Sequence, residues 1–471
     1  MANHFIRAST VVYFCLYGSL LMAGALDRTK PPDTPPIPSV KLPEAQDFQL
    51  SNGLSVIAAE DRRFPLTTIR IAFLAGSKYD PKDLPGLSDS VAALLNQGTA
   101  TRSAQQIAEQ AADLGGAIEA TSAPDSLVLS GSCLAQNAAR FLALLADVAR
   151  NSSFPDDEIE LQKQNRLQML RAERSQASYL GREELHMALF GGHPYSHIGP
   201  TEHSLTQLNK KVLDQFRDAY LVPNNAYLIL VGQLPSKEEL KKIISAEFGA
   251  WQRKEVPAYQ VPAIPENKKS LILVDRPGSV QADVFSAHLA PSYSSPDYFP
   301  LAVGAMVLGG GANSRLFEDI REKHGFAYDA HTEHDSLKEA ALVTAVTEVR
   351  NQVVGDALGV LNDHLAAISK QDVSARELVD AKNSFAGRFI LRLERQSGLA
   401  EQLVRIQIMG LPKDYLDTFT TRVRSVEPDQ IRSTGKYWDP GDATLVVVGD
   451  AAKIQRSLEK YGTVNVTKPP Q

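Results

Sequence analysis

The sequence has few cysteines, and it has no long block of charge of one sign. Among its 471 residues only Cys15 and Cys133 are cysteines, and the formal net charge is -6. If the N-terminus is removed, Cys133 stands alone and an intrachain disulfide is excluded; we interpret it as a buried structural thiol rather than a reactive one. Without a basic stripe to neutralise phosphates, nucleic acid is excluded as the main partner.

Long hydrophobic runs are also missing after the first 25 residues. Residues 1–25 carry one charged side chain, Arg7, then an apolar run from Val11 to Met22 and the segment Ala23-Gly24-Ala25. This order predicts a secretory signal peptide over 1–25 and therefore an exported protein, periplasmic or extracellular. An uncleaved anchor stays open as the alternative, although about 15 apolar residues is short for a membrane span. We expect no stable membrane span elsewhere.

Composition and proline content divide the rest of the chain. The sequence is 43% hydrophobic and 22% charged, which is typical of a soluble globular protein of two to four domains. Six prolines fall between residues 28 and 44, so residues 26–44 are predicted to form an extended tether. A second proline-containing stretch, 251–269, is predicted to link a domain over 45–250 to one over 270–465.

Hydrophobic periodicity predicts similar elements in both domains. In the first domain we expect a hairpin turn at Ser51–Gly53, a buried strand over 67–74, an alternating strand over 125–133, and helices over 103–114, 135–150 and 156–188, the last as one long charged helix. In the second we expect strands over 271–275 and 282–289 and a helix over 298–308.

Two short segments indicate an internal repeat. Residues 220–232 and 437–449 share Tyr, Pro, Ala, Val and Gly at one offset, 217 residues, and in each copy a turn leads into a β-branched strand. These identities in register make duplication the natural explanation. The predicted architecture is therefore two α+β domains of about 200 residues each.

A series of short motifs then occurs in a fixed order. In the first domain they are Ala75–Asp80 (AGSKYD), Gly86-Leu87, Gly98-Thr99, Leu114–Gly116, Gly192–Tyr195 (GHPY) and Gly199–Thr201; in the second they are Leu308–Gly311 (LGGG), Ser314–Phe317 (SRLF) and Ile320–Lys323 (IREK). Over about residues 45–465 the chain thus resembles the family of pitrilysin, insulin-degrading enzyme and mitochondrial processing peptidase, the inverzincin metallopeptidases. The resemblance implies two homologous pitrilysin-like (LuxS/MPP-like) domains, each a mostly antiparallel sheet with helices packed on it, forming one half of a clamshell.

The resemblance also locates a zinc site that this chain has lost. In active members the helix that begins at Gly-Leu carries His-x-x-Glu-His: the histidines bind zinc and the glutamate is the general base. Here Asp89 and Ala93 stand at the histidine positions and Ala92 at the base, while Met169 stands where a later helix supplies the third ligand. A catalytic zinc needs three protein ligands, and a thioether is a poor one. We therefore expect no metal, no other cofactor and no catalytic residue in this chain, with Ala92 and Ala93 packed on the core and Asp89 solvated or near the helix start.

The other histidines and acidic residues do not favour a replacement metal site. His193 and His197 flank Pro194 in a loop. His331 and His334, on or beside a strand, are three apart and should point to opposite faces. We expect Glu183, Glu184 and His186 to be ordinary surface residues. The run Gly309–Gly311 lacks the Lys-Ser/Thr sequel of a phosphate loop, so we expect a hinge or helix-entry role.

One functional pair of the family is retained. Arg321 and Tyr328 have the spacing of an arginine and a tyrosine that help to hold the substrate near the metal in family members. Gly325 is expected to end the helix before Tyr328 begins the next strand. Arg321 can bond a peptide carbonyl or a developing oxyanion, and Tyr328 can donate to the same carbonyl. The plain structural alternative is that Arg321 neutralises a helix C-terminus and Tyr328 packs on the sheet.

Retention of the pair without the zinc site implies half of a composite active site. The hypothesis is a non-catalytic, substrate-binding subunit of a heterodimeric zinc metalloendopeptidase, whose zinc is carried by a homologous partner. A peptide or partly unfolded polypeptide would bind by adding a strand to a sheet edge, and by resemblance the strand before Gly76-Ser77 is the candidate edge. The alternatives are an inactive homologue that serves as a structural, scaffold or binding subunit, and a self-sufficient hydrolase with unrecognised ligands.

Overall fold

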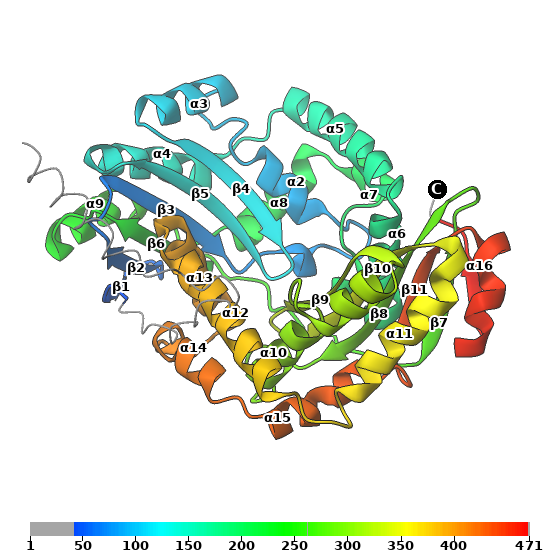
Figure 1. Ribbon diagram of the computed structural model, residues 1–471. Helices are drawn as coiled ribbons and strands as arrows, with labels where there is room; N and C mark the ends of the chain where they lie inside the picture. The colour runs from blue at the N-terminus through cyan, green and yellow to red at the C-terminus, as the bar shows by residue number, and fades with distance from the viewer. Residues whose placement is uncertain (1–41, 261, 470–471) are drawn as a thin grey trace, which may run out of the picture. The chain divides into compact units, whose positions relative to one another are not determined.

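The structure, a computed structural model, describes residues 42–260 and 262–469. The predicted signal peptide over 1–25 and the tether up to residue 41 lie outside the described residues. Two six-stranded sheets organise the described chain (Figure 1). Within this part, none of the helices combines the length and the apolar character that a membrane span requires.

The first sheet is built from the first domain and has the order β1-β2-β6-β3-β5-β4. β2 and β6 run parallel, and the other neighbours are antiparallel. The predicted hairpin turn is confirmed, with Gly53 at φ 93°, a value that suits glycine. The strands are β1 (Ala45–Gln49), β2 (Ser55–Glu60), β3 (Leu66–Phe73), β4 (Ala117–Ala123), β5 (Ser126–Leu134) and β6 (Ala226–Gly232).

The second sheet, with the order β12-β7-β11-β8-β10-β9, repeats this topology except at its outer strand, because β12 is parallel to β7 whereas β1 is antiparallel to β2. β6 and β11 hold the two repeat segments, and each runs parallel to one neighbour and antiparallel to the other. The predicted α+β fold of two homologous, mostly antiparallel domains is thus confirmed. The strands are β7 (Ser270–Asp275), β8 (Gln281–Ala290), β9 (Ala327–Ser336), β10 (Ala341–Arg350), β11 (Thr444–Gly449) and β12 (Val464–Thr467).

The helices of the first domain follow the prediction except at one place. The expected helix over 156–188 is wrong as a single element, because Gln176 is extended (φ -92°, ψ 130°) and separates α5 from α6. The predicted helices over 103–114 and 135–150 are confirmed as α3 and α4. The helices are α2 (Leu87–Leu94), α3 (Ala104–Asp113), α4 (Ala138–Asn151), α5 (Asp156–Arg174), α6 (Ala177–Phe190), α7 (Glu202–Gln207), α8 (Lys210–Tyr220) and α9 (Lys237–Phe248).

The helices of the second domain appear in a matching order. A π-helix, η5 (Phe317–Lys323), stands between α10 and β9, where the first domain has α3 between α2 and β4. The predicted helix over 298–308 is confirmed as α10, which is almost entirely buried. The α-helices are α10 (Tyr298–Gly309), α11 (Val354–Ala367), α12 (Ala375–Leu393), α13 (Gln396–Met409), α14 (Tyr415–Arg424), α15 (Pro428–Ser433) and α16 (Ala451–Leu458).

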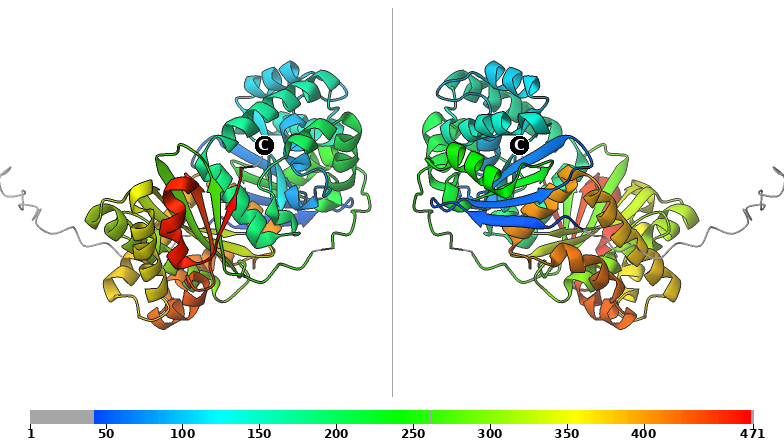
Figure 2. Two further views of the ribbon diagram at one scale, coloured as in Figure 1. Left: turned by 90° about the vertical axis from the view of Figure 1, so that its right-hand side faces the viewer. Right: turned by 90° about the vertical axis from the view of Figure 1, so that its left-hand side faces the viewer.

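The two domains exchange a helix in each direction. α6 of the first domain packs on β8 and β11 of the second sheet, where Gly181 lies so close to Phe285 that a Cβ would meet its ring at 2.2 Å. α13 of the second domain packs on β3 and β6, and the Gln396 side chain donates to the Asp61 carbonyl at 3.0 Å. Figure 2 shows orange α13 against the blue strands. Each sheet is therefore covered on one face by a helix from the other domain.

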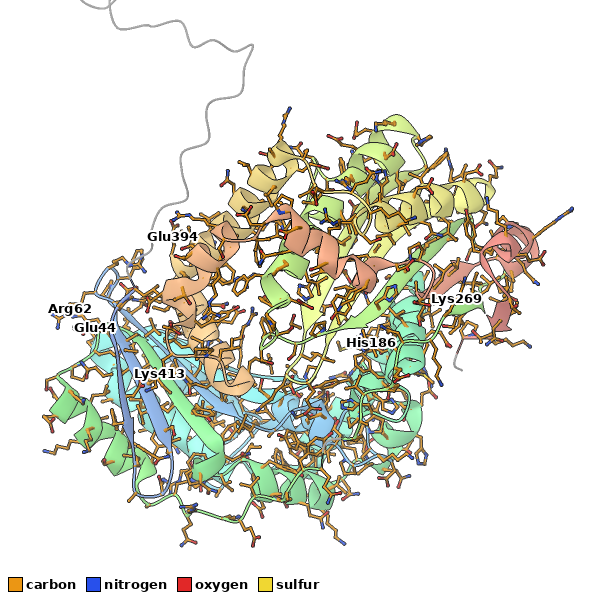
Figure 3. The ribbon with its side chains drawn as sticks, turned by 90° about the horizontal axis from the view of Figure 1, so that it is seen from below. Glu44, Arg62, His186, Lys269, Glu394 and Lys413 are labelled. Atoms are coloured by element: carbon orange, nitrogen blue, oxygen red, sulfur yellow. The ribbon has the colours of Figure 1, made fainter. Side chains whose placement is uncertain are left out.

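The turn after α13 makes a further link to the first sheet. Lys413 forms an ion pair of 2.6 Å with Asp47 of β1, and it is labelled beside that strand in Figure 3. Both side chains are exposed, so this pair adds little to stability. Residues 252–260 and 262–269, in the predicted linker, contain no helix or strand.

The candidate substrate edge is wrong. β3, the strand before Gly76-Ser77, pairs with β5 on one side and with β6 on the other, so its backbone groups are already used. The edge strands of the two sheets are β1 and β4 in the first and β12 and β9 in the second. Of these, β4 pairs with β5 only and β9 pairs with β10 only. A peptide could add a strand at either of these edges.

Cys133 lies on β5 inside the first core. It is fully buried, and burial raises the pKa of its thiol to about 11. A thiol with this pKa is protonated at neutral pH and therefore unreactive. The interpretation of Cys133 as a buried structural thiol is confirmed.

Candidate functional site

The entry to α2 is fixed by a buried carboxyl group. Asp80 accepts hydrogen bonds from the backbone amides of Gly86 and Ser88, both at 2.8 Å. Burial raises the pKa of Asp80 to about 8 against the effect of these bonds. Gly86 has φ 84°, and a Cβ there would meet Pro200 at 2.6 Å, so only glycine fits. The motif residues thus set the position of the helix that would carry the zinc ligands.

The degenerate positions lie on the first two turns of α2. Ala92 is buried and Ala93 is half-buried, as expected for packing residues. Of the two alternatives expected for Asp89, the structure confirms a place near the helix start rather than a solvated one, because Asp89 lies in the first turn and is half-buried beside Ser122 of β4. Burial raises the pKa of Asp89, while the Ser122 hydroxyl and the charge of Arg166 oppose that rise.

Helix α5 presents a cation where a metal would be needed. Arg166 and Glu173, which form an ion pair of 2.9 Å, are the α5 groups that act on Asp89. Met169 lies three residues after Arg166 and four residues before Glu173, so the three side chains share one face of α5. The Met169 side chain is 56% exposed. This face therefore offers a guanidinium, a thioether at the ligand position, and one carboxylate, Glu173, that is already paired with Arg166.

The described residues hold no group of three or more His, Cys, Asp or Glu side chains placed to bind a metal. At the family position, Asp89 is the one side chain able to ligate, and the positive charge of Arg166 opposes a divalent cation. These residues do not fit a catalytic zinc, and no step of a reaction can be assigned to a metal in this chain.

Grafting the ligands should therefore restore zinc binding only weakly. We expect the variant Asp89→His/Ala92→Glu/Ala93→His/Met169→Glu to bind zinc, and the addition of Arg166→Met to raise its affinity roughly tenfold by removing the opposing charge. Competition with a chromophoric chelator measures the zinc dissociation constant of each variant. Arg171→Met, an exposed α5 arginine, is the control. Equal affinity with and without Arg166 would contradict the electrostatic explanation.

A cavity of about 560 Å³ opens beside these positions. The ends of β4 and β9 reach it, and the segment 191–199 forms one wall. Its lining includes Lys82, Asp89, Ser122, His186, His193, His197, Tyr259 and Asp335. The hydroxyl of Tyr259 is buried without a hydrogen-bond partner, so it is a free donor at the cavity. The cavity thus combines an apolar wall with several titratable side chains, and it is formed by both domains.

The expectation that Glu183, Glu184 and His186 are surface residues is wrong. Glu183 pairs with Arg174 at 2.8 Å, and both are largely buried. His186 Nδ1 lies 2.9 Å from the Tyr195 carbonyl, and burial lowers the pKa of its ring. Burial also raises the pKa of Glu184. Charged residues on a helix suggest a solvated face, but α6 is enclosed because it crosses to the second sheet.

A buried charge network joins the two domains and was not predicted. Lys78, in the turn Ser77–Tyr79, pairs with Asp125 at 2.9 Å and with Glu339 of the β9–β10 turn at 3.1 Å. Asp125 accepts from the Tyr195 hydroxyl at 2.6 Å and from the Lys338 amide at 2.9 Å. Lys78 belongs to the AGSKYD motif and Tyr195 to the GHPY motif. Membership of these motifs is the sequence feature that could have pointed to the network.

His193 completes this network as a neutral donor. Its Nδ1 accepts from the Tyr195 amide at 3.1 Å, so the ring proton belongs on Nε2, which lies 3.1 Å from Glu339 Oε2. Burial lowers the pKa of His193 below its usual value, against the attraction of Glu339. His193 and His197 both line the cavity, and His193 has a structural role there.

The two histidines of His331–His334 point to opposite faces of β9, as predicted. His331 lies between Asp329 at 2.7 Å and Glu333 at 3.4 Å, and Arg182 of α6 holds Glu333 with two short bonds. His334 faces the other way and packs against the Tyr298 ring. The pair therefore cannot share one metal ion.

His334 should make stability depend on pH. Burial lowers its pKa from 6.5 to about 4, so the folded protein resists protonation that the unfolded chain accepts. The contribution is complete above pH 6.5 and is lost as pH falls toward 4, by about 2–3 kcal/mol. In denaturant unfolding, the His334→Gln variant should lose correspondingly less unfolding free energy between pH 6.5 and pH 4. The exposed His203→Gln should behave as the parent protein, and a parallel pH profile for both variants would contradict the assignment.

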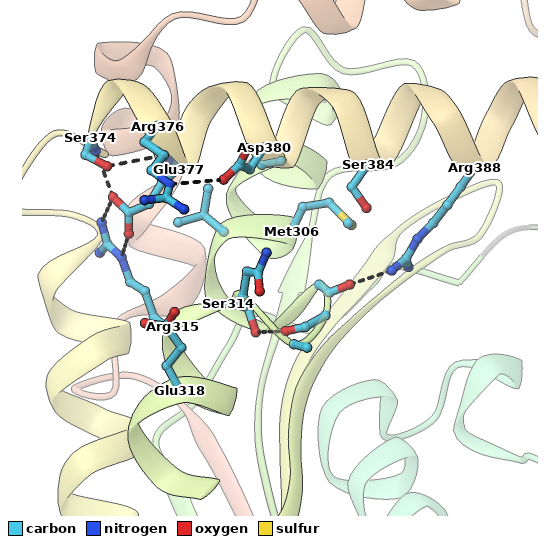
Figure 4. Close-up of a pocket in the computed structure, with 16 residues that line it drawn as sticks. Met306, Ser314, Arg315, Glu318, Ser374, Arg376, Glu377, Asp380, Ser384 and Arg388 are labelled. Atoms are coloured by element: carbon cyan, nitrogen blue, oxygen red, sulfur yellow. Dashed lines mark hydrogen bonds and ion pairs between the residues drawn. The ribbon is translucent and has the colours of Figure 1, made fainter. Parts of the chain in front are cut away.

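The glycine run Gly309–Gly311 ends α10 rather than binding phosphate. A Cβ on Gly309 would meet the Thr332 amide of β9 at 2.2 Å, which explains the glycine by close packing. A cavity of about 650 Å³ lies between this loop and α12 (Figure 4). Its Arg315 is held by Glu377 at 2.6 and 3.2 Å, and this pairing lowers the pKa of Glu377 to about 2. Of the two expected roles, helix entry is wrong, because the run forms the exit of α10.

Arg321 and Tyr328 are brought together on the second domain. The Arg321 guanidinium carbon lies 4.6 Å from the centre of the Phe317 ring and 4.7 Å from that of Tyr328. Gly325, at φ 60°, ends η5, and Tyr328 is the second residue of β9 and 83% exposed. Arg321 also forms an ion pair of 3.3 Å with Glu322. The plain alternative, a tyrosine packed on the sheet, does not match this exposure.

Fold and site together define a duplicated metallopeptidase-like protein whose zinc positions are degenerate. The comparisons agree with this class. The sequence model named "Insulinase (Peptidase family M16)" matches residues 55–199, and the "Peptidase M16 inactive domain" matches residues 207–385. The chain belongs to peptidase family M16.

Relatives and solved structures cover nearly the whole described chain. The "Uncharacterized zinc protease YmxG" of Bacillus subtilis is 20% identical over 414 residues, 86% of this chain and 98% of that protein. The "Non-peptidase homolog YmxG" of Helicobacter pylori is 23% identical over 401 residues, 84% and 92% of the two chains. A peptidase M16 inactive domain from Pseudomonas fluorescens superposes with a TM-score of 0.80 at 26% identity, covering 86% of this chain and 98% of that one. These names support an inactive peptidase homologue.

Proposed function

We propose that this protein is the non-catalytic, substrate-binding subunit of an exported heterodimeric zinc metalloendopeptidase. It supplies Arg321 and Tyr328 to a composite active site, and a homologous partner with an intact His-x-x-Glu-His carries the zinc. The family membership and the degenerate positions Asp89, Ala92 and Ala93 support an inactive homologue. The heterodimer and the role of the pair go beyond those findings.

The observation that carries the proposal is the contact of Arg321 with two aromatic rings, one of which, Tyr328, is exposed. The guanidinium carbon lies 4.6 and 4.7 Å from the two ring centres, and side-chain exposure of 34% leaves it accessible. The helix that holds it is a π-helix, a rare form that often occurs at functional sites. An arginine needed merely to neutralise a helix end would not require two aromatic walls.

This geometry suits stabilisation of charge on a substrate carbonyl. Guanidinium N–H groups donate to an oxyanion as water attacks the peptide bond, and the Tyr328 hydroxyl can donate beside them. Neither group requires the metal to be on the same chain. A zinc subunit that faces this surface would complete the site.

The substrate would be a peptide or an unfolded polypeptide bound in extended form. β4 is the edge that we favour, because it pairs with β5 alone and because its last residues, Ser122 and Ala123, line the 560 Å³ cavity next to Asp89. A strand added to β4 would use its free backbone groups and run toward that cavity.

Reconstitution tests the proposal. The purified chain alone should show no peptide cleavage and hold no stoichiometric zinc. Mixing it with its homologous zinc-bearing subunit should give cleavage of a quenched fluorescent peptide that a chelator abolishes. A stable complex without proteolysis would establish the scaffold function instead, and chelator-sensitive cleavage by the isolated chain would overturn both.

A further inference from the structure

A second pocket, of about 550 Å³, lies in the second domain. It is formed by the segment before α10, the turn between α13 and α14, and the turn after α14. Its walls are aromatic rings and prolines, chiefly Phe299, Tyr415, Pro296 and Pro412. Nothing in the proposed peptidase role uses these residues.

Arg422 is the one charged residue among those that line this pocket. It is half-buried, and its guanidinium carbon lies 5.9 Å from the centre of the Phe299 ring. No ion pair among the described residues includes Arg422, whereas Arg315, Arg405 and Arg432 of the same domain each have a carboxylate. The pocket thus carries one positive charge with no acidic group in its lining.

The walls are fixed by packing. Phe299 and Tyr415 are buried, with ring centres 6.3 Å apart, and Phe299 also meets Phe419 edge-on at 5.4 Å. The Tyr415 hydroxyl is hydrogen-bonded to Tyr298, and burial raises the pKa of Tyr415 to about 12. In this bond the Tyr298 hydroxyl donates and the Tyr415 hydroxyl accepts, and Arg422 is the charged donor of the pocket.

We propose that this pocket binds the C-terminal end of a polypeptide that finishes in an apolar or aromatic residue. The α-carboxylate pairs with Arg422, and the terminal side chain lies over Phe299 and against Tyr415. A chain end carries one negative charge beside one side chain, which matches one guanidinium beside one aromatic wall. A segment with several acidic residues would bring further carboxylates that no other cation in the lining can pair.

The site acts in the isolated chain and needs neither zinc nor a partner subunit. Its test is fluorescence polarisation with the full chain and a labelled five-residue peptide that ends in phenylalanine. The free acid should bind, and the same peptide with a C-terminal amide should bind at least tenfold more weakly. Arg422→Met and Arg422→Gln should each weaken binding of the free acid about tenfold.

The controls separate the chain end from other ligands. Arg424→Met, an exposed arginine on the same helix that does not line the pocket, should bind as the parent does. Equal binding of acid and amide would overturn the proposal. So would tighter binding of an amidated peptide with an internal glutamate, which would assign the pocket to acidic segments. Unchanged thermal unfolding of both Arg422 variants confirms that the fold is kept.

Discussion

Replacing Arg321 with alanine should lower kcat of the reconstituted complex about 10²–10³-fold, with a smaller effect on KM. This is the usual loss when one donor to a developing oxyanion is removed, because the interaction is stronger in the transition state than in the bound substrate. The isolated chain should unfold at nearly the same denaturant concentration as before, since Arg321 is only half-buried and its acidic contact, Glu322, is exposed. Steady-state kinetics with a saturating zinc subunit provide the measurement.

Three further variants identify which property of the Arg321–Tyr328 contact contributes to turnover. Tyr328→Phe keeps the aromatic wall and removes the hydroxyl, so a loss there reports hydrogen bonding to the substrate. Arg321→Lys keeps the charge but loses the planar fork, and it should remain well below the parent. Arg376→Ala, a highly exposed arginine of the same domain, should leave kcat unchanged. Full activity of Arg321→Ala would remove the substrate role.

The second large effect is expected at Lys78. The Lys78→Met variant should lose about 3–5 kcal/mol of unfolding free energy, because it leaves Asp125 and Glu339 buried without their cation. Lys78 and Asp125 are each 3% exposed. Burial alone would lower the pKa of Lys78, but the attraction of Asp125 raises it above its usual value, so the ammonium stays charged in the folded protein. Urea unfolding monitored by circular dichroism measures the change.

Neutralising the partners should recover part of this loss. In Lys78→Met/Asp125→Asn/Glu339→Gln no uncompensated charge remains, so the triple variant should be more stable than Lys78→Met alone. Lys241→Met, an exposed lysine of α9, should change stability by less than about 0.5 kcal/mol. A loss below about 1 kcal/mol for Lys78→Met would contradict the importance of the network.

Local patterns in the sequence predicted most of the individual elements. The repeat placed β6 and β11 in equivalent positions of two sheets, an apolar run located β3, and alternation located β5, both to within one residue. The break after α5 was missed because Ser175 and Gln176 contain neither glycine nor proline, so charge and periodicity continued across it. In such a case the boundary depends on tertiary packing, which periodicity does not report.

Strand order and helix exchange were beyond local patterns. A buried strand such as β3 reads the same whether it lies at an edge or in the centre, and the residues that pair with it are far away in sequence. In the same way, the apolar positions of α6 indicate that the helix is covered, but not that β8 and β11 of the other domain cover it. For this reason the pattern of α6 predicts surface positions for His186 and Glu183, which the structure encloses.

The candidate site was predictable only where motifs carried it. The degenerate positions and the Arg321–Tyr328 spacing were visible in the sequence, and the structure brings that pair into contact. Arg166 was not singled out, since an arginine on a charged helix normally faces solvent. Its relevance to Asp89 depends on how α5 crosses α2, which no spacing reveals.

The reciprocal crossing of α6 and α13 has a consequence for biosynthesis. A nascent chain that has reached residue 250 already holds all strands of its first sheet, yet the helix that covers β3 and β6 starts only at residue 396. The first domain therefore cannot complete its packing until most of the second repeat has left the ribosome. A gene split between residues 250 and 270 would encode two polypeptides that each expose an uncovered apolar sheet, soluble together and aggregation-prone apart.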